Sequence, residues 1–370
     1  MPVSIDINVS SMTSSLIKGD VVLNVPTKDT EENPAYLLKL RLMGRIKTKA
    51  THDERVGTAG GSHRRRSRTE TVAAIEKKEI LGQDMELASF DGTVAPGTHT
   101  FAFSSPLPPD LPPSTEEIGK NGGMCSIRYS LKARLYRSRT ASDGVSSDMS
   151  DPRTTRHIKI WGKPRSEARS AESVLVGPET QAVRTCCSKA GSVSIGYRVD
   201  SLRVGTGETI GLDVAARNDS SSTVTAMHIK IQQLTNWGAH GHGDHKKRTL
   251  SSILVRDSSL GALQWPAEAG TRRGQSIASV AEAAREDLRR QIAAGTGTRY
   301  ELFVPRDALL TVQAGPIEVK HFLVVELQIK GASSPPDIST PLQVQRPPVS
   351  GSGAQAMSGS LLSPLPEAVP

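Results

Sequence analysis

Apolar side chains recur at every second position in several long stretches of this chain. The clearest stretch runs from Cys125 to Leu135, where every odd-numbered residue is apolar and every even-numbered residue is polar. A period of two is typical of a β-strand with one buried face. The same alternation returns at 38–46, 193–199, 210–216 and 317–329. The sequence therefore predicts an all-β protein.

One segment has a different period. From Ser276 to Ala294, apolar residues such as Leu288 and Ile292 recur at helical spacing. The pattern predicts one amphipathic helix between strands of the second half. Its apolar stripe is narrow and rich in alanine, so we expect the helix to lie on its own sheet rather than to bind a partner.

A proline-dense run separates two of the predicted strands. Phe101 and Phe103 alternate with small residues, and prolines then crowd the stretch from Pro106 to Pro113. Proline cannot donate a hydrogen bond to a neighbouring strand. The run therefore predicts an extended crossing from one strand to the next.

This passage resembles the arrestin N-terminal domain, which has a glycine, a Phe-x-Phe strand, an LP-x-x-LP-x-S crossing and an I-x-Y-x-L-x-A-x-L strand. The matching positions are Gly97, Phe101, Phe103, Leu107, Pro108, Leu111, Pro112, Ser114, Ile127, Tyr129, Leu131, Ala133 and Leu135. The insert from Glu116 to Met124 is at the long end of that pattern. Residues 205–233 and 317–329 similarly resemble the arrestin C-terminal domain.

The resemblance implies two tandem antiparallel immunoglobulin-like β-sandwiches. We expect an N-terminal sandwich over residues 1–165, an interdomain linker over 166–190 and a C-terminal sandwich over 191–345. Residues 346–370 are rich in proline, serine and glycine, a composition that predicts a disordered tail.

Charge adds a candidate binding segment. The chain has 370 residues and a formal net charge of +8, and the basic excess lies mainly in residues 1–165. Such an excess suits acidic partners, although it also serves solubility. We predict that residues 51–70 form a mobile basic loop. Its candidate phosphate- or lipid-contact residues are Arg64, Arg65, Arg66 and Arg68, and a simply solvated loop is the equal alternative. The charge run holds no aromatic residue, which argues against nucleic acid as the partner.

Cysteine usage and hydropathy indicate the compartment. Cys125 falls on the apolar phase of its strand, whereas Cys186 and Cys187 are adjacent and poorly placed to pair with each other. An odd number of cysteines without a spacing pattern favours a reducing compartment. With neither a signal pattern nor a long apolar run, we expect a cytoplasmic protein that associates peripherally with membranes and is recruited to the plasma membrane or endosomes.

One cluster of residues could carry metal chemistry. His240, His242, Asp244 and His245 offer imidazole and carboxylate ligands within six residues. Lys246 and its basic neighbours would repel a cation, and the interspersed glycines would leave the site loose. We therefore favour a solvated basic loop, and expect neither a bound metal nor another cofactor.

The resemblance implies a non-enzymatic adaptor. Such a protein would bind membrane-protein cargo or receptor tails and link them to endocytic or intracellular trafficking machinery, with anionic lipid headgroups as a further partner. Two alternatives stay open: a structural subunit of a retromer-like endosomal coat, and a metal-dependent enzyme that uses the histidine-rich segment.

Overall fold

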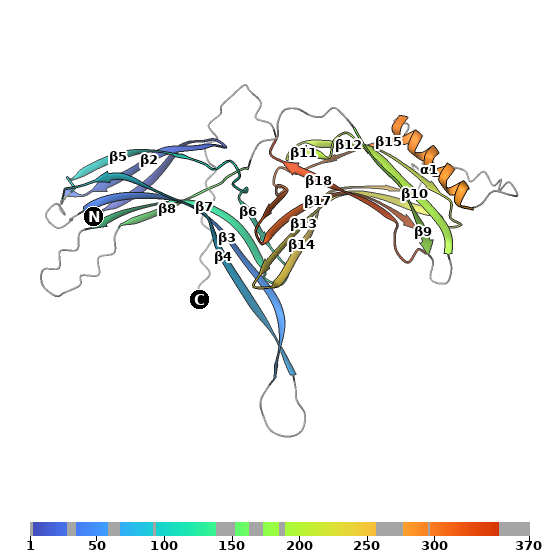
Figure 1. Cartoon of the computed structure of the whole chain (residues 1–370), viewed down its shortest axis with the longest axis horizontal. Coiled ribbons are helices and arrows are strands. Elements are labelled where there is room, and N and C mark those ends of the chain that lie inside the picture. Colours follow the sequence, from blue (N-terminus) through green and yellow to red (C-terminus); the bar gives the residue numbers. More distant parts are fainter. Residues whose placement is uncertain are drawn as a thin grey trace, which may run out of the picture.

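The computed structural model describes residues 3–27, 35–57, 67–91, 94–137, 152–162, 173–184, 189–256, 277–294 and 297–347. The chain forms two halves that lie side by side, each built from two layered β-sheets (Figure 1). The predicted fold class, two tandem antiparallel β-sandwiches, is confirmed. Every strand pairing in the described residues is antiparallel except that of the short strand β11 with β18.

The first half contains strands β1 to β8. Its upper sheet in Figure 1 has the order β1-β2-β5, made of β1 (Ser4–Met12), β2 (Leu16–Val25) and β5 (Gly97–Pro106). Its lower sheet has the order β4-β3-β7-β6, with β8 also paired to β7. Its strands are β3 (Ala35–Gly57), β4 (Ser67–Ser89), β6 (Thr115–Ile118), β7 (Met124–Arg137) and β8 (Arg153–Ile158).

The alternation read from the sequence decides which face of each strand is buried. Along β7, every odd-numbered residue from Cys125 to Leu135 is buried in the core of the first half. The proline-rich crossing between β5 and β6 packs against the same core. The Tyr129 hydroxyl donates a hydrogen bond of 2.7 Å to the carbonyl of Pro112, so a buried aromatic ring holds the crossing in place.

The second half repeats this arrangement. One sheet has the order β15-β12-β10-β9, made of β9 (Val174–Arg184), β10 (Lys189–Val199), β12 (Thr209–Asn218) and β15 (Thr298–Phe303). The other has the order β11-β18-β17-β13-β14, with β16 also paired to β17. Its strands are β11 (Arg203–Gly205), β13 (Val224–Ala239), β14 (His242–Arg256), β16 (Val312–Ala314), β17 (Ile317–Ile329) and β18 (Asp337–Gln345).

The predicted helix is present as α1 (Ile277–Ala294). It packs on the outer face of the sheet formed by β9, β10 and β12, where Leu288 and Ile292 are buried against Ala215. Gly196 of β10 lies beneath Ile292, and a Cβ atom at that position would be 2.5 Å from the Ile292 Cδ1 atom. The helix therefore lies on its own sheet, as expected.

Two predictions about irregular segments are wrong in part. Residues 51–57 and 67–70, expected to belong to a mobile loop, extend β3 and β4 into a long hairpin that projects from between the two halves (Figure 1). Residues 51–54 are half-buried or exposed and belong to neither hydrophobic core, so an apolar period gives no signal there. Residues 174–184, expected to belong to a linker, form β9 and pair with β10 over nearly their whole length. Residues 58–66, 163–172 and the tail beyond residue 347 lie outside the described residues.

The two halves have separate hydrophobic cores that share strands. The N-terminal part of β13 and the C-terminal part of β17 supply residues such as Ile229 and Val325 to the core of the second half. The opposite ends of the same strands supply Trp237 of β13 and Ile317 and Val319 of β17 to the core of the first half. The first sandwich is therefore completed by side chains from the second half of the sequence.

Candidate interaction surface and the junction between the halves

The outer face of the lower sheet in the first half is strongly basic. Residues directly opposite one another in antiparallel strands point to the same face. From the row of Lys39 to the row of Lys47, the basic residues on this face are Lys39, Arg41, Arg45, Lys47, Lys77, Arg128, Lys132, Arg134 and Arg153, and the acidic ones are Glu79, Asp84, Glu86 and Glu116. We call this set of residues the basic face.

Ion pairs form mainly at the edges of the basic face. Arg41 contacts Glu79 at 2.7 Å on the β4 side, and Arg128 contacts Glu116 at 2.5 Å on the β6 side. Among the described residues, no carboxylate pairs with Lys132 or Arg153. The β7–β8 side of the face therefore keeps charge that is available to an anionic partner.

Aromatic contacts organise one end of the basic face. The Arg134 guanidinium lies 4.7 Å from the centroid of the Tyr136 ring, and the Lys39 ammonium lies 5.7 Å from the same centroid. Cation–π contacts of this kind hold basic side chains over a ring without neutralising them. The charge at this end is thus positioned as well as exposed.

Trp237 is the largest side chain at the junction between the halves. It belongs to β13 but is 2% exposed, packed into the core of the first half. Its indole N–H donates a hydrogen bond of 3.0 Å to the carbonyl of Lys49, and the Thr48 hydroxyl donates one of 2.7 Å to the carbonyl of Gly238. Burial and hydrogen bonds together join β3 to β13.

A polar chain of contacts also crosses the junction. Lys246 of β14 contacts one carboxylate oxygen of Glu117 at 2.6 Å, and Gln233 donates a hydrogen bond of 3.3 Å to the other. Gln233 is 1% exposed, and its Oε1 atom accepts hydrogen bonds from the amide of Leu309 at 3.2 Å and from His321 Nε2 at 3.4 Å. Glu117 of the first half is thereby connected to the interior of the second.

His321 ends this chain inside the second half. Because Gln233 Oε1 can only accept, Nε2 of His321 carries the proton, and Nδ1 accepts from the Thr311 hydroxyl at 2.9 Å. The ring is 1% exposed. Burial lowers the pKa of His321 to about 4, so the ring is neutral near pH 7.

The long insert of the first half forms part of the junction. After β6, a turn from Gly119 to Gly123 packs against β13 and β14. A Cβ atom at Gly119 would be 3.0 Å from the Trp237 ring, and one at Gly123 would overlap Asp244 Oδ2. Oδ2 is buried and makes no hydrogen bond, whereas Oδ1 accepts one of 2.7 Å from the amide of His245. The glycines of the insert therefore permit a close approach of backbone to side chain.

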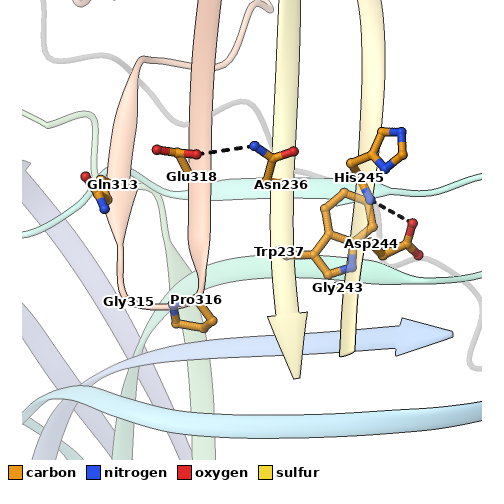
Figure 2. A pocket seen from close by; sticks show the side chains of 9 residues that line it. All are labelled: Asn236, Trp237, Gly243, Asp244, His245, Gln313, Gly315, Pro316 and Glu318. Carbon is orange, nitrogen blue, oxygen red and sulfur yellow. Dashed lines mark hydrogen bonds between the residues drawn. The ribbon is translucent and has the colours of Figure 1, made fainter. Parts of the chain in front are cut away.

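A cleft of about 450 Å³ lies beside the junction. Figure 2 shows its lining, with side chains from β13, β14 and the β16–β17 hairpin. Asn236 donates a hydrogen bond of 3.2 Å to Glu318, and Lys320 contacts the other oxygen of Glu318 at 2.8 Å. The hydrogen bond from Lys320 lowers the pKa of Glu318. The Asn236–Glu318 pair is thus satisfied within the protein, and we assign no ligand to this cleft.

The structure does not gather the candidate metal ligands. The His240 Nε2 atom contacts the carbonyl of Ile75 at 3.0 Å, and the His242 ring stacks on His52 with centroids 3.5 Å apart. Asp244 and His245, as neighbours in β14, point to opposite faces of the sheet. No group of three or more potential ligands in a metal-binding arrangement occurs in the described ranges. These residues do not form a loop. They form the tip of the β13–β14 hairpin, which contacts β3 and β4.

The predicted contact arginines are placed only in part. Arg64, Arg65 and Arg66 lie outside the described residues. Arg68 lies in β4, opposite Val56. Among the cysteines, Cys125 is fully buried as expected, and burial raises the pKa of its thiol to about 12. Cys186 and Cys187 lie outside the described residues.

Comparison with known families agrees with this architecture. The family model described as "Arrestin (or S-antigen), N-terminal domain" matches residues 12–153. That range contains β2 to β7 entirely and reaches the last residue of β1 and the first residue of β8, and it includes the proline crossing. This match over the first half supports an arrestin-family protein. Members of this family are in general non-enzymatic adaptors in protein trafficking, and the match supports that general role here.

The described part of the chain holds no helix with the length and apolar character required to cross a membrane.

Sequence reasoning missed the basic face because its residues are scattered over five strands. The signal was nonetheless present, since Arg128, Lys132 and Arg134 occupy the polar phase of the β7 alternation. Only the pairing register shows that Lys39 and Arg41 of β3 share their face. A clustered run such as that at residues 64–68 is easier to see in a sequence than a surface assembled from separate strands.

Proposed function

We propose that this protein is a non-enzymatic adaptor that binds the cytoplasmic segments of membrane-protein cargo or receptors and links them to endocytic or intracellular trafficking. The single observation that supports it best is the basic face, where Lys132 of β7 and Arg153 of the edge strand β8 have no carboxylate partner among the described residues. Acidic segments complement such a surface, and charge complementarity accelerates and orients binding.

The physical basis is electrostatic attraction over an extended area. Single interactions between opposite charges at a protein surface are weak, but several of them along one segment add up.

We also propose that the boundary between the two domains falls between Gly162 and Val174, because the pairing of β9 with β10 adds residues 174–184 to the second sandwich. The arginines at positions 64–66 and 68 remain candidate contacts for the same anionic partners or for lipid headgroups.

Binding of a defined acidic peptide tests the proposal. A labelled decapeptide of alternating glutamate and serine is compared by fluorescence anisotropy with a peptide that carries glutamine in place of glutamate. We expect binding of the acidic peptide alone, weaker at 200 mM than at 50 mM salt. The double variant K132E/R153E should bind it roughly tenfold more weakly, because two attractive charges become repulsive.

A matched control separates the basic face from net charge. Lys247 is exposed on β14 of the second half, and K247E is compared with the single variant K132E, which changes the net charge by the same amount; K247E should bind the acidic peptide nearly as well as the unaltered protein. Equal binding of the two peptides, or equal loss in both variants, would contradict the proposal. In cells, proximity labelling with K132E/R153E should recover fewer membrane proteins than with K247E. A constant stoichiometric complex that is insensitive to the charge reversal would favour a coat subunit instead.

A further inference from the structure

An apolar row crosses the outer face of the lower sheet immediately beyond the basic face. Ile118 of β6 is opposite Met124 of β7, Met124 is opposite Lys49 of β3, and Lys49 is opposite Ile75 of β4. The four side chains therefore share one face of the sheet. We call Ile118, Met124 and Ile75 the apolar row.

The apolar row is exposed to an unusual degree for β-branched side chains within a sheet. Ile118 is 58% exposed and Ile75 is 47% exposed. Single exposed apolar residues are common on protein surfaces, but an aligned set is typical of interaction sites. Between them, the aliphatic stem of Lys49 continues the apolar surface while its ammonium group stays polar.

We propose that the apolar row binds an aliphatic side chain of an acidic, extended peptide whose charged part lies on the basic face. This inference rests on the proposed function and specifies the partner. The row would then select, among acidic segments, those that carry a leucine, isoleucine or valine at one end.

Charge and length favour a peptide as the occupant. Lys47 and Lys77 lie in the next row of the same face, so the apolar row is continuous with positive charge. The rows of Lys39 and Lys49 are ten residues apart along β3, which corresponds to about 33 Å at the rise of an antiparallel strand. An extended segment of about ten residues spans that distance. A flat bilayer fits this surface less well, because the β3–β4 hairpin projects beyond it (Figure 1).

Three decapeptides test the inference. The first carries six glutamates and two leucines at one end, the second replaces the leucines with serines, and the third replaces the glutamates of the first with glutamines. We expect the unaltered protein to bind the first about tenfold more tightly than the second, because burying leucine side chains removes apolar surface from water. The third should bind more weakly than the first.

Variants locate the effect. The double variant I118S/I75S should bind the first and second peptides equally, with an affinity close to that of the unaltered protein for the second. L254S is the matched control, since Leu254 of β14 is 45% exposed but lies on the other half. It should keep the full preference for leucine. Thermal denaturation of each variant checks that these exposed substitutions leave the fold intact.

The outcomes distinguish this inference from the proposed function. If acidic peptides bind but leucine gives no advantage, or if the advantage survives in I118S/I75S, the apolar row does not select the partner. If no acidic peptide binds, the proposed function itself fails. Vesicles of phosphatidylcholine and phosphatidylserine at 7:3 provide the remaining arm. Vesicle binding that I118S/I75S abolishes, without any peptide preference, would overturn the inference in favour of a membrane surface.

Discussion

His321 lies in the interior of the second half as a neutral ring with both nitrogens hydrogen-bonded. Thr311 donates to one nitrogen, and the other donates to Gln233. A protonated ring would lose the acceptor at Nδ1 and place a charge in a buried site. The arrangement is therefore stable only while the ring is neutral.

This environment predicts a dependence of stability on pH. In the unfolded chain, His321 has a pKa near 6.5, whereas in the folded protein it is about 4. As the pH falls from 6.5 to 4, the unfolded state takes up the proton and the folded state does not. The free energy of unfolding attributable to this residue should therefore decrease by roughly 3 kcal/mol over that interval, and change little above pH 7 or below pH 4.

Urea denaturation at several pH values measures this contribution. The variant H321Q should be less stable than the unaltered protein near pH 7, with the difference shrinking as the pH falls. H228Q is the matched control, since His228 lies half-buried on the outer face of β13. A difference between H321Q and the unaltered protein that stays constant with pH would show that His321 does not titrate as expected.

The alternation of residues predicted the position of His321 but not its partners. His321 falls on the apolar phase of residues 317–329, so its burial followed from the sequence. Gln233 and Thr311 are far from it in the chain, and their contacts depend on the pairing of β13 with β17 and on the path of the loop before β16. Side-chain hydrogen bonds between distant segments have no local signal.

At the level of elements, a regular apolar period predicted a strand or helix correctly, whereas short or irregular strands had no such period and were missed. The strand from Cys125 to Leu135 and helix α1 were predicted correctly because each has one face against a core. The strand β18 was missed because its segment contains Pro341. That proline is tolerated because β11 pairs only with Gln343–Gln345, which leaves the other edge of β18 open at position 341.

Helix α1 provides a prediction at this scale. Most of the stability of a helix in a protein comes from packing of its apolar face, so the order of α1 depends on docking through Leu288 and Ile292. I292A should reduce the free energy of local opening by about 2 kcal/mol or more, which corresponds to roughly 30-fold faster amide hydrogen exchange. The acceleration should be confined to residues 277–294, with β12 unaffected.

A surface substitution on the same helix is the control. Arg290 has a side chain that is 71% exposed, and R290A should leave the exchange rates of the helix nearly unchanged. Faster exchange throughout β10 and β12 in I292A would show instead that the helix supports the whole sheet. Unchanged exchange in the helix would mean that Ile292 does not anchor it.

At the scale of the whole molecule, Trp237 joins two sandwiches that the sequence pattern describes separately. Truncation to alanine removes an indole that is 2% exposed together with its hydrogen bond to Lys49. W237A should destabilise the protein by about 3–5 kcal/mol in urea denaturation. The matched variant W161A removes an indole that is 38% exposed and lies 3.9 Å from the Lys159 ammonium, so it should cost about 1 kcal/mol. Similar losses in both variants would contradict the role of Trp237 in joining the halves.

The junction shows where sequence reasoning reaches its limit. The length of the insert from Glu116 to Met124 was visible in the sequence, but its function as a glycine-lined contact for Trp237 and Asp244 was not. The histidine-rich segment was recognised as unusual for its composition, yet its residues contact β3 and β4 rather than a metal. Contacts between halves depend on how the sheets are placed, and periodicity within one strand carries no information about that placement.

Because β13 and β17 each contribute side chains to both hydrophobic cores, unfolding of one sandwich removes part of the core of the other. A heating scan in a calorimeter should accordingly give one endotherm, whose measured enthalpy equals the van't Hoff value, where two independent domains would give two. The two sandwiches would then unfold as a single cooperative unit.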